Sequence, residues 1–215
     1  MNQLTGDGLK NINEWIASKS KDPLVADLTE TVKERESIKD LLFNFDLIKK
    51  EIKNSLPYIK PLKGEPYFRE EFVDDKWYSY MIDWFNTIDN KTIELFPHLL
   101  NIKNKHKDIR EMFVSVLKPG AIIAPHKAPW KGVVRLLLGI ETPNDERCTI
   151  TVDNNYHVFK DKEFIVFDDT FIHHASNHTN KDRVVLLINL SREMVDNEAQ
   201  IVLDKFNSMS NSLVS

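Results

Sequence analysis

The chain has a single cysteine, Cys148, among its 215 residues. One cysteine excludes an intrachain disulfide and any zinc site built from several thiolates. Packing must therefore stabilise the fold, and a bound metal would need histidine or oxygen ligands. This composition fits a reducing compartment, and we expect the protein to be cytoplasmic.

Long apolar runs and an excess of basic charge are also missing. No stretch approaches the roughly 20 apolar residues of a membrane span, and residues 1–21 are too polar for a signal peptide. The 29 Lys and Arg residues are outnumbered by 33 Asp and Glu residues, which gives a net charge of -4. We therefore expect no membrane span and no nucleic-acid partner.

Helical periodicity dominates the first part of the chain. Between residues 8 and 56, leucine, isoleucine and valine recur at helical intervals among many charged residues. This pattern predicts a helical N-terminal region over residues 1–65 that packs on the core. Its charged face is expected to be solvated, with a partner-binding helix as the alternative.

Short apolar strands fill the second half. An aromatic strand is expected at residues 76–84 and a short helix at 92–102. From Ile109 to Leu190, apolar runs of four to eight residues alternate with turn sequences and show no helical period. The fold class predicted is mainly β with a helical N-terminal region. Residues 66–195 would form an antiparallel barrel-like sandwich, and residues 196–215 a C-terminal tail.

Two histidines stand at strand-and-turn junctions of this half. His126 and His173 are 47 residues apart, and neutral imidazole is a common ligand of Fe(II). The carboxylate that often completes such a site is missing, because Ala128 stands two residues after the first histidine. His174 is the weaker candidate, since adjacent strand residues point to opposite faces. Taken alone, the histidines also fit structural or surface roles.

Polar side chains interrupt the same apolar runs. Arg135 lies within residues 133–138, Arg183 opens the run 184–190, and Ser115 lies within 113–117. A guanidinium in an apolar strand is costly to bury without an anion, and the planar fork of Arg183 suits a carboxylate. Arg135 could instead pair with Asp or Glu, and Arg183 could cap a strand at the surface.

Two further pairs of residues have competing interpretations. Asp168 and Asp169 precede a turn, and we interpret them as turn and supporting residues rather than as catalytic acids. Trp77 and Trp130 are candidates for lining a substrate pocket. Such aromatic residues can equally fill a core.

The chain resembles the aspartyl/asparaginyl β-hydroxylase family of Fe(II)- and 2-oxoglutarate-dependent oxygenases. The motifs that carry the resemblance stand in the family's order and cover about residues 75 to 192: residues 115–120, 125–126, 135–139, 167–173 and Arg183. The resemblance implies a double-stranded β-helix, the jelly-roll of the cupins. It also implies that His126 and His173 bind iron, that Arg183 with Ser115 holds the distal carboxylate of 2-oxoglutarate, and that Arg135 serves the other end of the cosubstrate or the substrate.

The reaction implied by the resemblance is hydroxylation of an unactivated C–H bond in a small molecule such as an amino acid, in a peptide side chain or in a lipid acyl group. Parts of the sequence are more similar to bacterial lipid hydroxylases than to the animal peptide hydroxylase. Leu137 departs from relatives that carry histidine there, which leaves the pose of the cosubstrate open. Two alternatives stay open: Ala128 would leave room for a halide, as in aliphatic halogenases, or the chain could be a cupin-like binding protein without catalysis.

Overall fold

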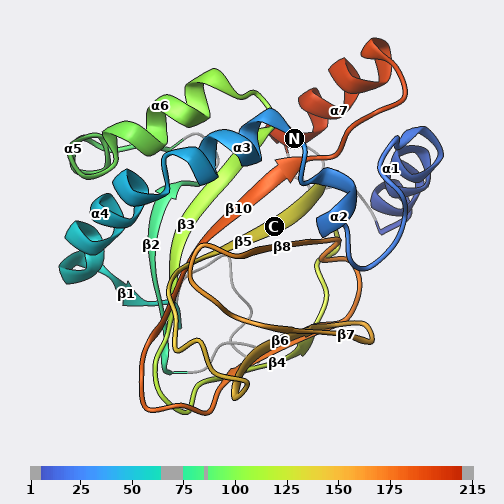
Figure 1. The fold of residues 1–215 in the computed structure, drawn as a ribbon. Coiled ribbons are helices and arrows are strands. Elements are labelled where there is room, and N and C mark those ends of the chain that lie inside the picture. The colour runs from blue at the N-terminus through green and yellow to red at the C-terminus, as the bar shows by residue number, and fades with distance from the viewer. Residues whose placement is uncertain (1–5, 64–74, 85–86, 210–215) are drawn as a thin grey trace.

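The computed structural model describes residues 6–63, 75–84 and 87–209 (Figure 1). Two antiparallel sheets form its body. In the described residues the larger sheet has the order β1-β2-β3-β10-β5-β8, with strands β1 Lys60–Pro61, β2 Trp77–Asp83, β3 Ile109–Leu117, β5 Val133–Glu141, β8 Phe164–Phe167 and β10 Arg183–Ser191. The smaller sheet has the order β4-β9-β6-β7, with strands β4 Ile122–His126, β6 Cys148–Val152, β7 Asn155–Val158 and β9 His173–Asn177.

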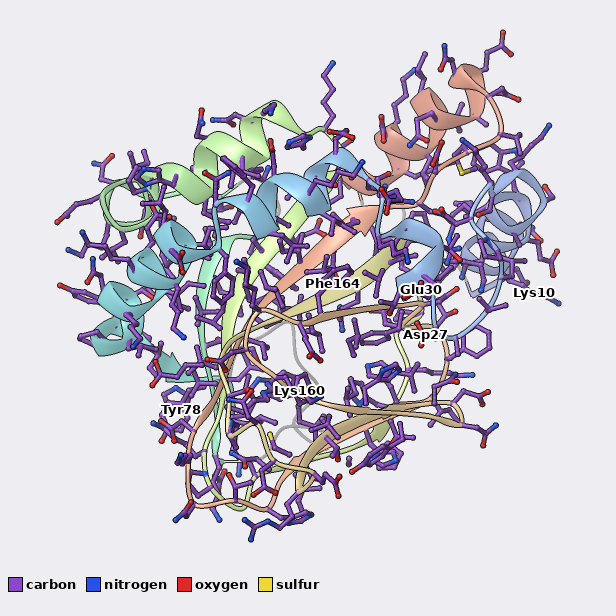
Figure 2. All side chains as sticks on the ribbon, in the orientation of Figure 1. Lys10, Asp27, Glu30, Tyr78, Lys160 and Phe164 are labelled. Atoms are coloured by element: carbon purple, nitrogen blue, oxygen red, sulfur yellow. The ribbon has the colours of Figure 1, made fainter. Side chains whose placement is uncertain are left out.

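The chain passes back and forth between the two sheets. From β3 onward it enters the smaller sheet at β4, returns at β5, crosses for β6 and β7, returns at β8, crosses for β9 and ends in β10. Two sheets wound together in this way form a double-stranded β-helix, so the predicted jelly-roll is confirmed. Figure 2 shows side chains filling the space between the sheets.

The larger sheet is covered on both faces. Along β3, Phe113 and Leu117 face the cluster between the sheets, whereas Val114 and Val116 face the cluster under the helices. Because both faces are buried, β3 and β10 read as nearly continuous apolar runs rather than as alternating patterns. A polar residue on the inner face, such as Ser115, is therefore conspicuous in the sequence.

Helices cover the outer face of the larger sheet (Figure 1). The strand expected at 76–84 and the helical character of residues 8–56 are confirmed. The single helix expected at 92–102 is instead two helices, because Pro97 starts a new helix directly after Phe96. The covering helices are α3 Glu36–Phe43, α4 Phe45–Ser55, α5 Asn90–Leu95 and α6 Pro97–Lys105. None of the helices within the described ranges is long and apolar enough to cross a membrane.

Two further helices pack together beside this layer. Helix α1 (Gly6–Lys19) and helix α7 (Asn197–Met209) share an apolar cluster that includes Ile16, Leu203 and Trp130. Residues 197–209 are therefore a packed helix, where the sequence led us to expect a tail. Its buried positions, Ala199, Leu203 and Asn207, follow one another at intervals of four residues, as expected for one face of a helix.

The segment before helix α2 (Thr29–Val32) extends the larger sheet beyond β8. Leu28 N–H donates to the Val166 carbonyl at 2.8 Å, and Asp168 N–H donates to the Ala26 carbonyl at 3.0 Å. The predicted boundary near residue 65 lies outside the described residues. The N-terminal region nevertheless contributes directly to the edge of the barrel.

Candidate active site

The two predicted metal ligands lie side by side on the smaller sheet. His126 at the end of β4 pairs in register with His173 at the start of β9, and their ring centroids are 4.2 Å apart. Each ring donates a hydrogen bond from Nδ1 to a backbone carbonyl, at 2.8 Å for Ala124 and 3.0 Å for Phe171. Since Nδ1 carries the proton in both rings, Nε2 carries the lone pair that a metal needs.

Burial favours the neutral form of both imidazoles. Removal from water lowers the pKa of His126, and it lowers the pKa of His173 to about 3, with the neighbouring His126 as the next cause. Neutral imidazole is the metal-binding form, so burial favours the state of the pair that can hold a cation. His174 is exposed, as expected for the residue next to a buried strand histidine.

A third protein ligand is missing from this pair. No cluster of three or more histidine, cysteine or acidic side chains with metal-binding geometry occurs in residues 6–63, 75–84 and 87–209. Ala128 stands where a carboxylate is often found, and its N–H donates to the Asp169 carbonyl at 2.7 Å. A metal held here would therefore have two ligands from the described part of the chain, with further positions left for small molecules.

Arg183 is a buried charged residue within the barrel. It is 2% exposed, it donates from Nη2 to the Ser115 hydroxyl at 2.9 Å, and its guanidinium lies 4.7 Å from the ring centroid of Phe159. Its Nε has no hydrogen-bond partner in the described structure, and burial lowers the pKa of Arg183 to about 10. A buried guanidinium without a carboxylate is a site prepared for an anion.

Ser115 connects this arginine to Trp77. The indole N–H of Trp77 also donates to the Ser115 oxygen, at 2.9 Å. Because the two lone pairs of the hydroxyl accept from Trp77 and Arg183, its own proton is left to donate to a ligand. Trp77 is 8% exposed and belongs to the apolar cluster between the sheets, and its role in lining a substrate pocket stays a prediction.

Arg135 already has protein partners. Its Nη2 lies 2.9 Å from Asp169 Oδ2, and its Nε donates to Asn189 Oδ1 at 3.1 Å. Arg135 therefore pairs with an acidic residue, which is one of the two interpretations drawn from the sequence. Arg135 also contributes, after burial, to the lowered pKa of both histidines, which places its charge close to them. Its role toward a cosubstrate stays a prediction.

The turn before His173 supports the interpretation of Asp168 as a turn residue. Its Oδ1 accepts from the backbone N–H and the hydroxyl of Thr170, at 3.0 and 2.6 Å. Its Oδ2 accepts from Arg192 at 2.6 Å. Asp169 is buried, and burial raises the pKa of its carboxyl group.

The structure places Trp130 in a different apolar cluster from Trp77. Its ring is 6% exposed, packs against Phe206 of α7 and donates to Asn207 Oδ1 at 2.9 Å. Trp130 therefore belongs to the cluster between α1 and α7, because it follows a loop that turns away from β4 toward these helices. It does not join the histidines.

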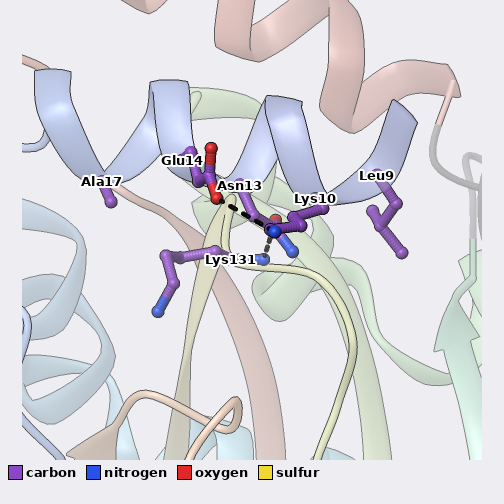
Figure 3. A pocket seen from close by; sticks show the side chains of 6 residues that line it. All are labelled: Leu9, Lys10, Asn13, Glu14, Ala17 and Lys131. Carbon is purple, nitrogen blue, oxygen red and sulfur yellow. Dashed lines mark hydrogen bonds and ion pairs between the residues drawn. The ribbon is translucent and has the colours of Figure 1, made fainter. Parts of the chain in front are cut away.

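A hollow of about 370 Å³ lies on the outer side of the same loop (Figure 3). Asn13 of α1 ties the loop down there, donating to the Pro129 carbonyl at 2.7 Å and accepting from the Lys131 N–H at 3.0 Å. The hollow contains neither histidine nor buried arginine. Its lining residues are Leu9, Lys10, Asn13, Glu14, Ala17 and Lys131.

Sequence reasoning missed two residues of this region. Asn189 is buried and accepts a hydrogen bond from Arg135. The sequence signal that could have identified it is a single amide side chain inside the apolar run of β10. Arg192 is completely buried beside Asp168. Nothing in its sequence position, directly after a strand, distinguishes it from a surface arginine.

Comparison with known proteins gives two kinds of relative. The ornithine lipid ester-linked acyl 2-hydroxylase of Rhizobium tropici is 29% identical over 123 residues, which cover 57% of this chain and 44% of that protein. Aspartate beta-hydroxylase domain-containing protein 2 of Homo sapiens is 32% identical over 80 residues, which cover 36% of this chain and 21% of that protein. The chain thus spans less than half the length of these curated relatives.

Solved structures with a similar arrangement include KdgF from Halomonas sp., with a TM-score of 0.37, 10% identity and coverage of 60% of this chain and 96% of that one. A cupin 2 conserved barrel domain protein from Salinispora arenicola has a TM-score of 0.36 and 14% identity, and the match covers 60% of this chain and 87% of that one. The family model described as aspartyl/asparaginyl beta-hydroxylase matches residues 43–193, well over half of the chain. The chain therefore belongs to the aspartyl/asparaginyl β-hydroxylase family.

Proposed function

We propose that this protein is an Fe(II)- and 2-oxoglutarate-dependent oxygenase that hydroxylates an unactivated C–H bond. The observation that carries the proposal is the buried guanidinium of Arg183, which has no acidic partner among the residues that the structure describes and shares the barrel with two buried histidines. A dicarboxylate cosubstrate would supply the missing anion. Membership of a hydroxylase family supports the same reaction class.

His126 and His173 would hold the iron through Nε2. The backbone carbonyls of Ala124 and Phe171 fix both rings in the tautomer that this requires. When bound, Fe(II) supplies the redox chemistry by which dioxygen converts 2-oxoglutarate to succinate and carbon dioxide while a substrate C–H bond becomes C–OH. The two-histidine set fits Fe(II), since the positions not taken by protein are needed by the cosubstrate and dioxygen.

Arg183 and Ser115 would bind the distal carboxylate of 2-oxoglutarate. The guanidinium offers planar donors, and the Ser115 hydroxyl offers the proton that its protein contacts leave unused. Phe159 stacks against the guanidinium and helps exclude water from it. Binding in a dry pocket strengthens the attraction between arginine and carboxylate.

Arg135 would act at the end of the cosubstrate nearer the histidines. Asp169 and Asn189 hold its guanidinium by Nη2 and Nε. A side chain held in this way loses little further freedom when it binds a ligand. Its remaining donors could bind the keto-acid end of 2-oxoglutarate or a polar group of the substrate.

The substrate class that we propose to test first is a lipid acyl group. The lipid-hydroxylating relative aligns over 57% of this chain, whereas the human relative aligns over 36%. Aspartyl or asparaginyl side chains of peptides are the second class. Both offer an unactivated C–H bond, so neither changes the proposed chemistry.

Substrate-dependent turnover of 2-oxoglutarate tests the proposal. The purified protein, loaded with Fe(II) under ascorbate, is incubated with acyl lipids or with aspartyl and asparaginyl peptides, and succinate and products are quantified by mass spectrometry with and without chloride. A product heavier by one oxygen, formed in step with succinate and reduced in Arg183→Met at limiting 2-oxoglutarate, supports the proposal. A chlorinated product would indicate halogenation, and ligand binding without any succinate would indicate a binding protein; either result contradicts hydroxylation.

A further inference from the structure

We propose that Arg192 is a positioning residue, which fixes the two histidine-bearing segments relative to each other. The residue lies at the end of β10, is 0% exposed and has no place in the proposed chemistry. Its guanidinium and its backbone reach both segments. The inference rests on the proposed function only where metal binding is measured.

The first segment is the loop that follows His126. Arg192 Nε donates to the Lys131 carbonyl at 2.9 Å, and its backbone N–H donates to the Gly132 carbonyl at 3.0 Å. Both contacts fix the end of a loop that begins at the first histidine. Ala128 in the same loop donates to the Asp169 carbonyl at 2.7 Å, so the loop also contacts the second segment directly.

The second segment is the turn that precedes His173. Arg192 Nη2 donates to Asp168 Oδ2 at 2.6 Å, and the other carboxylate oxygen of Asp168 accepts from Thr170. Phe171 N–H donates to the Asp168 carbonyl at 3.1 Å. The carbonyl of Phe171 then accepts from His173 Nδ1 at 3.0 Å. A short chain of hydrogen bonds through Asp168 and Phe171 therefore connects the guanidinium of Arg192 to the imidazole of His173.

The energetics of burial make this arrangement sensitive to change. Both partners of the Arg192–Asp168 ion pair are 0% exposed, and Lys131 Nζ lies farther from the same carboxylate oxygen, at 3.6 Å. Loss of the closer partner of a buried charge is strongly unfavourable. The pair is therefore maintained only while the loop, the turn and the strand end keep their present places. Groups that orient metal-binding histidines typically change metal affinity about ten- to hundredfold when they are removed.

Arg192→Met is the first variant, and Arg35→Met is its matched control. Arg35 also makes a largely buried ion pair, with Asp22 at 2.7 Å, and also donates to a carbonyl of β10, that of Ser191 at 3.0 Å. It touches neither histidine segment. Both variants lose one arginine–aspartate pair, so a purely structural role predicts similar losses of stability and no selective loss at the histidines.

Anaerobic calorimetric titration with Fe(II) alone, together with urea denaturation, gives the first readout. We expect Arg192→Met to raise the Fe(II) Kd about ten- to hundredfold, and Arg35→Met to leave it within about threefold of the original protein. Arg192→Lys, which can keep one contact with Asp168 but not the fork of donors, should lie between them. Equal Kd values for folded Arg192→Met and Arg35→Met would overturn the proposal.

A second readout needs no metal. Nitrogen-15 spectra of the histidine rings in the apoprotein report which ring nitrogen carries the proton. The original protein and Arg35→Met should show the Nδ1-protonated tautomer for both rings, whereas Arg192→Met or Arg192→Lys should show averaging at His173. Unchanged spectra in these variants would overturn the positioning role. Failure of the original protein to bind Fe(II) would instead contradict the proposed function. The nitrogen-15 spectra would still test the positioning role of Arg192, because they need no metal.

Discussion

The guanidinium of Arg183 gives the sharpest prediction at the scale of single residues. Its Nε is buried without a partner, which commonly costs about 1–3 kcal/mol. Arg183→Met should therefore raise the free energy of unfolding of the apoprotein by a similar amount, measured by urea denaturation. The same variant should weaken binding of 2-oxoglutarate at least about tenfold, because a charge-assisted hydrogen bond is lost.

Arg147→Met is the control for this variant. Arg147 pairs with Asp145 at 2.7 Å on the surface, so its removal should change both quantities little. A destabilised Arg183→Met apoprotein that still binds 2-oxoglutarate normally would mean that the arginine is a structural residue.

Cys148 gives a pH-dependent prediction. Burial raises the pKa of its thiol to about 11, above the value of about 8.5 in an unfolded chain. At pH 8 roughly one native thiol in a thousand would be ionised, against roughly a quarter of unfolded thiols. We expect iodoacetamide to modify the native protein at least about 100-fold more slowly than the denatured protein.

The same shift affects stability with a definite sign. Because the unfolded state releases the thiol proton first as pH rises, Cys148 lowers the free energy of unfolding between about pH 8.5 and 11. Urea midpoints at pH 8 and pH 10 should differ less in Cys148→Ala than in the original protein. An identical pH dependence in the two proteins would contradict the shift.

Single residues also show what the sequence can and cannot predict. Ser115 and Arg183 were recognisable as candidate site residues because a polar group inside an apolar strand is costly to bury without a partner. The partner of Arg135 was not, since Asp169 lies 34 residues away and meets it only once the sheets have formed. Arg192 carries no local signal at all.

At the scale of elements, the two tryptophans predicted to line the substrate site have separate environments. Trp77 on β2 donates to Ser115, and Trp130 donates to Asn207 on α7. Replacing either by Phe removes one indole hydrogen bond and should cost about 1 kcal/mol of stability. Only Trp77→Phe should raise the KM for 2-oxoglutarate, several-fold, in steady-state assays of succinate formation. An equal change of KM in Trp130→Phe would contradict the placement of this residue outside the site.

Strand β5 depends on a close backbone approach at Gly139. A Cβ built there would lie 2.0 Å from the Lys160 carbonyl oxygen. Gly139→Ala should therefore destabilise the protein by about 1–3 kcal/mol or more, as measured by urea denaturation. Gly8→Ala in helix α1, where alanine favours the helix, serves as the control and should be neutral or slightly stabilising. A Gly139→Ala protein as stable as this control would contradict the described packing.

The elements themselves were largely predictable. The strands and most helices follow from apolar periodicity and turn residues, whereas α7 was expected to be a tail. The apolar residues Ala199, Leu203 and Phe206 stand at helical spacing and were the available signal. The pairing of strands was not accessible from periodicity, because residues far apart in sequence form each sheet.

At the scale of the whole molecule, the N-terminal segment and the barrel form one structure around the site. The family match begins at residue 43, yet Ala26 and Leu28 bond to β8 and its following turn, and Arg192 reaches the Pro23 carbonyl at 3.4 Å. Residues outside the family match thus help to hold the turn that bears His173.

Anaerobic titration of the apoprotein with Fe(II) and then 2-oxoglutarate tests the central claim most directly. The original protein should develop the visible charge-transfer band of an iron(II) complex with a 2-oxo acid. His126→Ala should lose the band because it lacks a metal ligand, and Arg183→Met should need at least about tenfold more 2-oxoglutarate to form it. Fe(II)-loaded, folded protein that gives no band at saturating 2-oxoglutarate would contradict the proposed oxygenase.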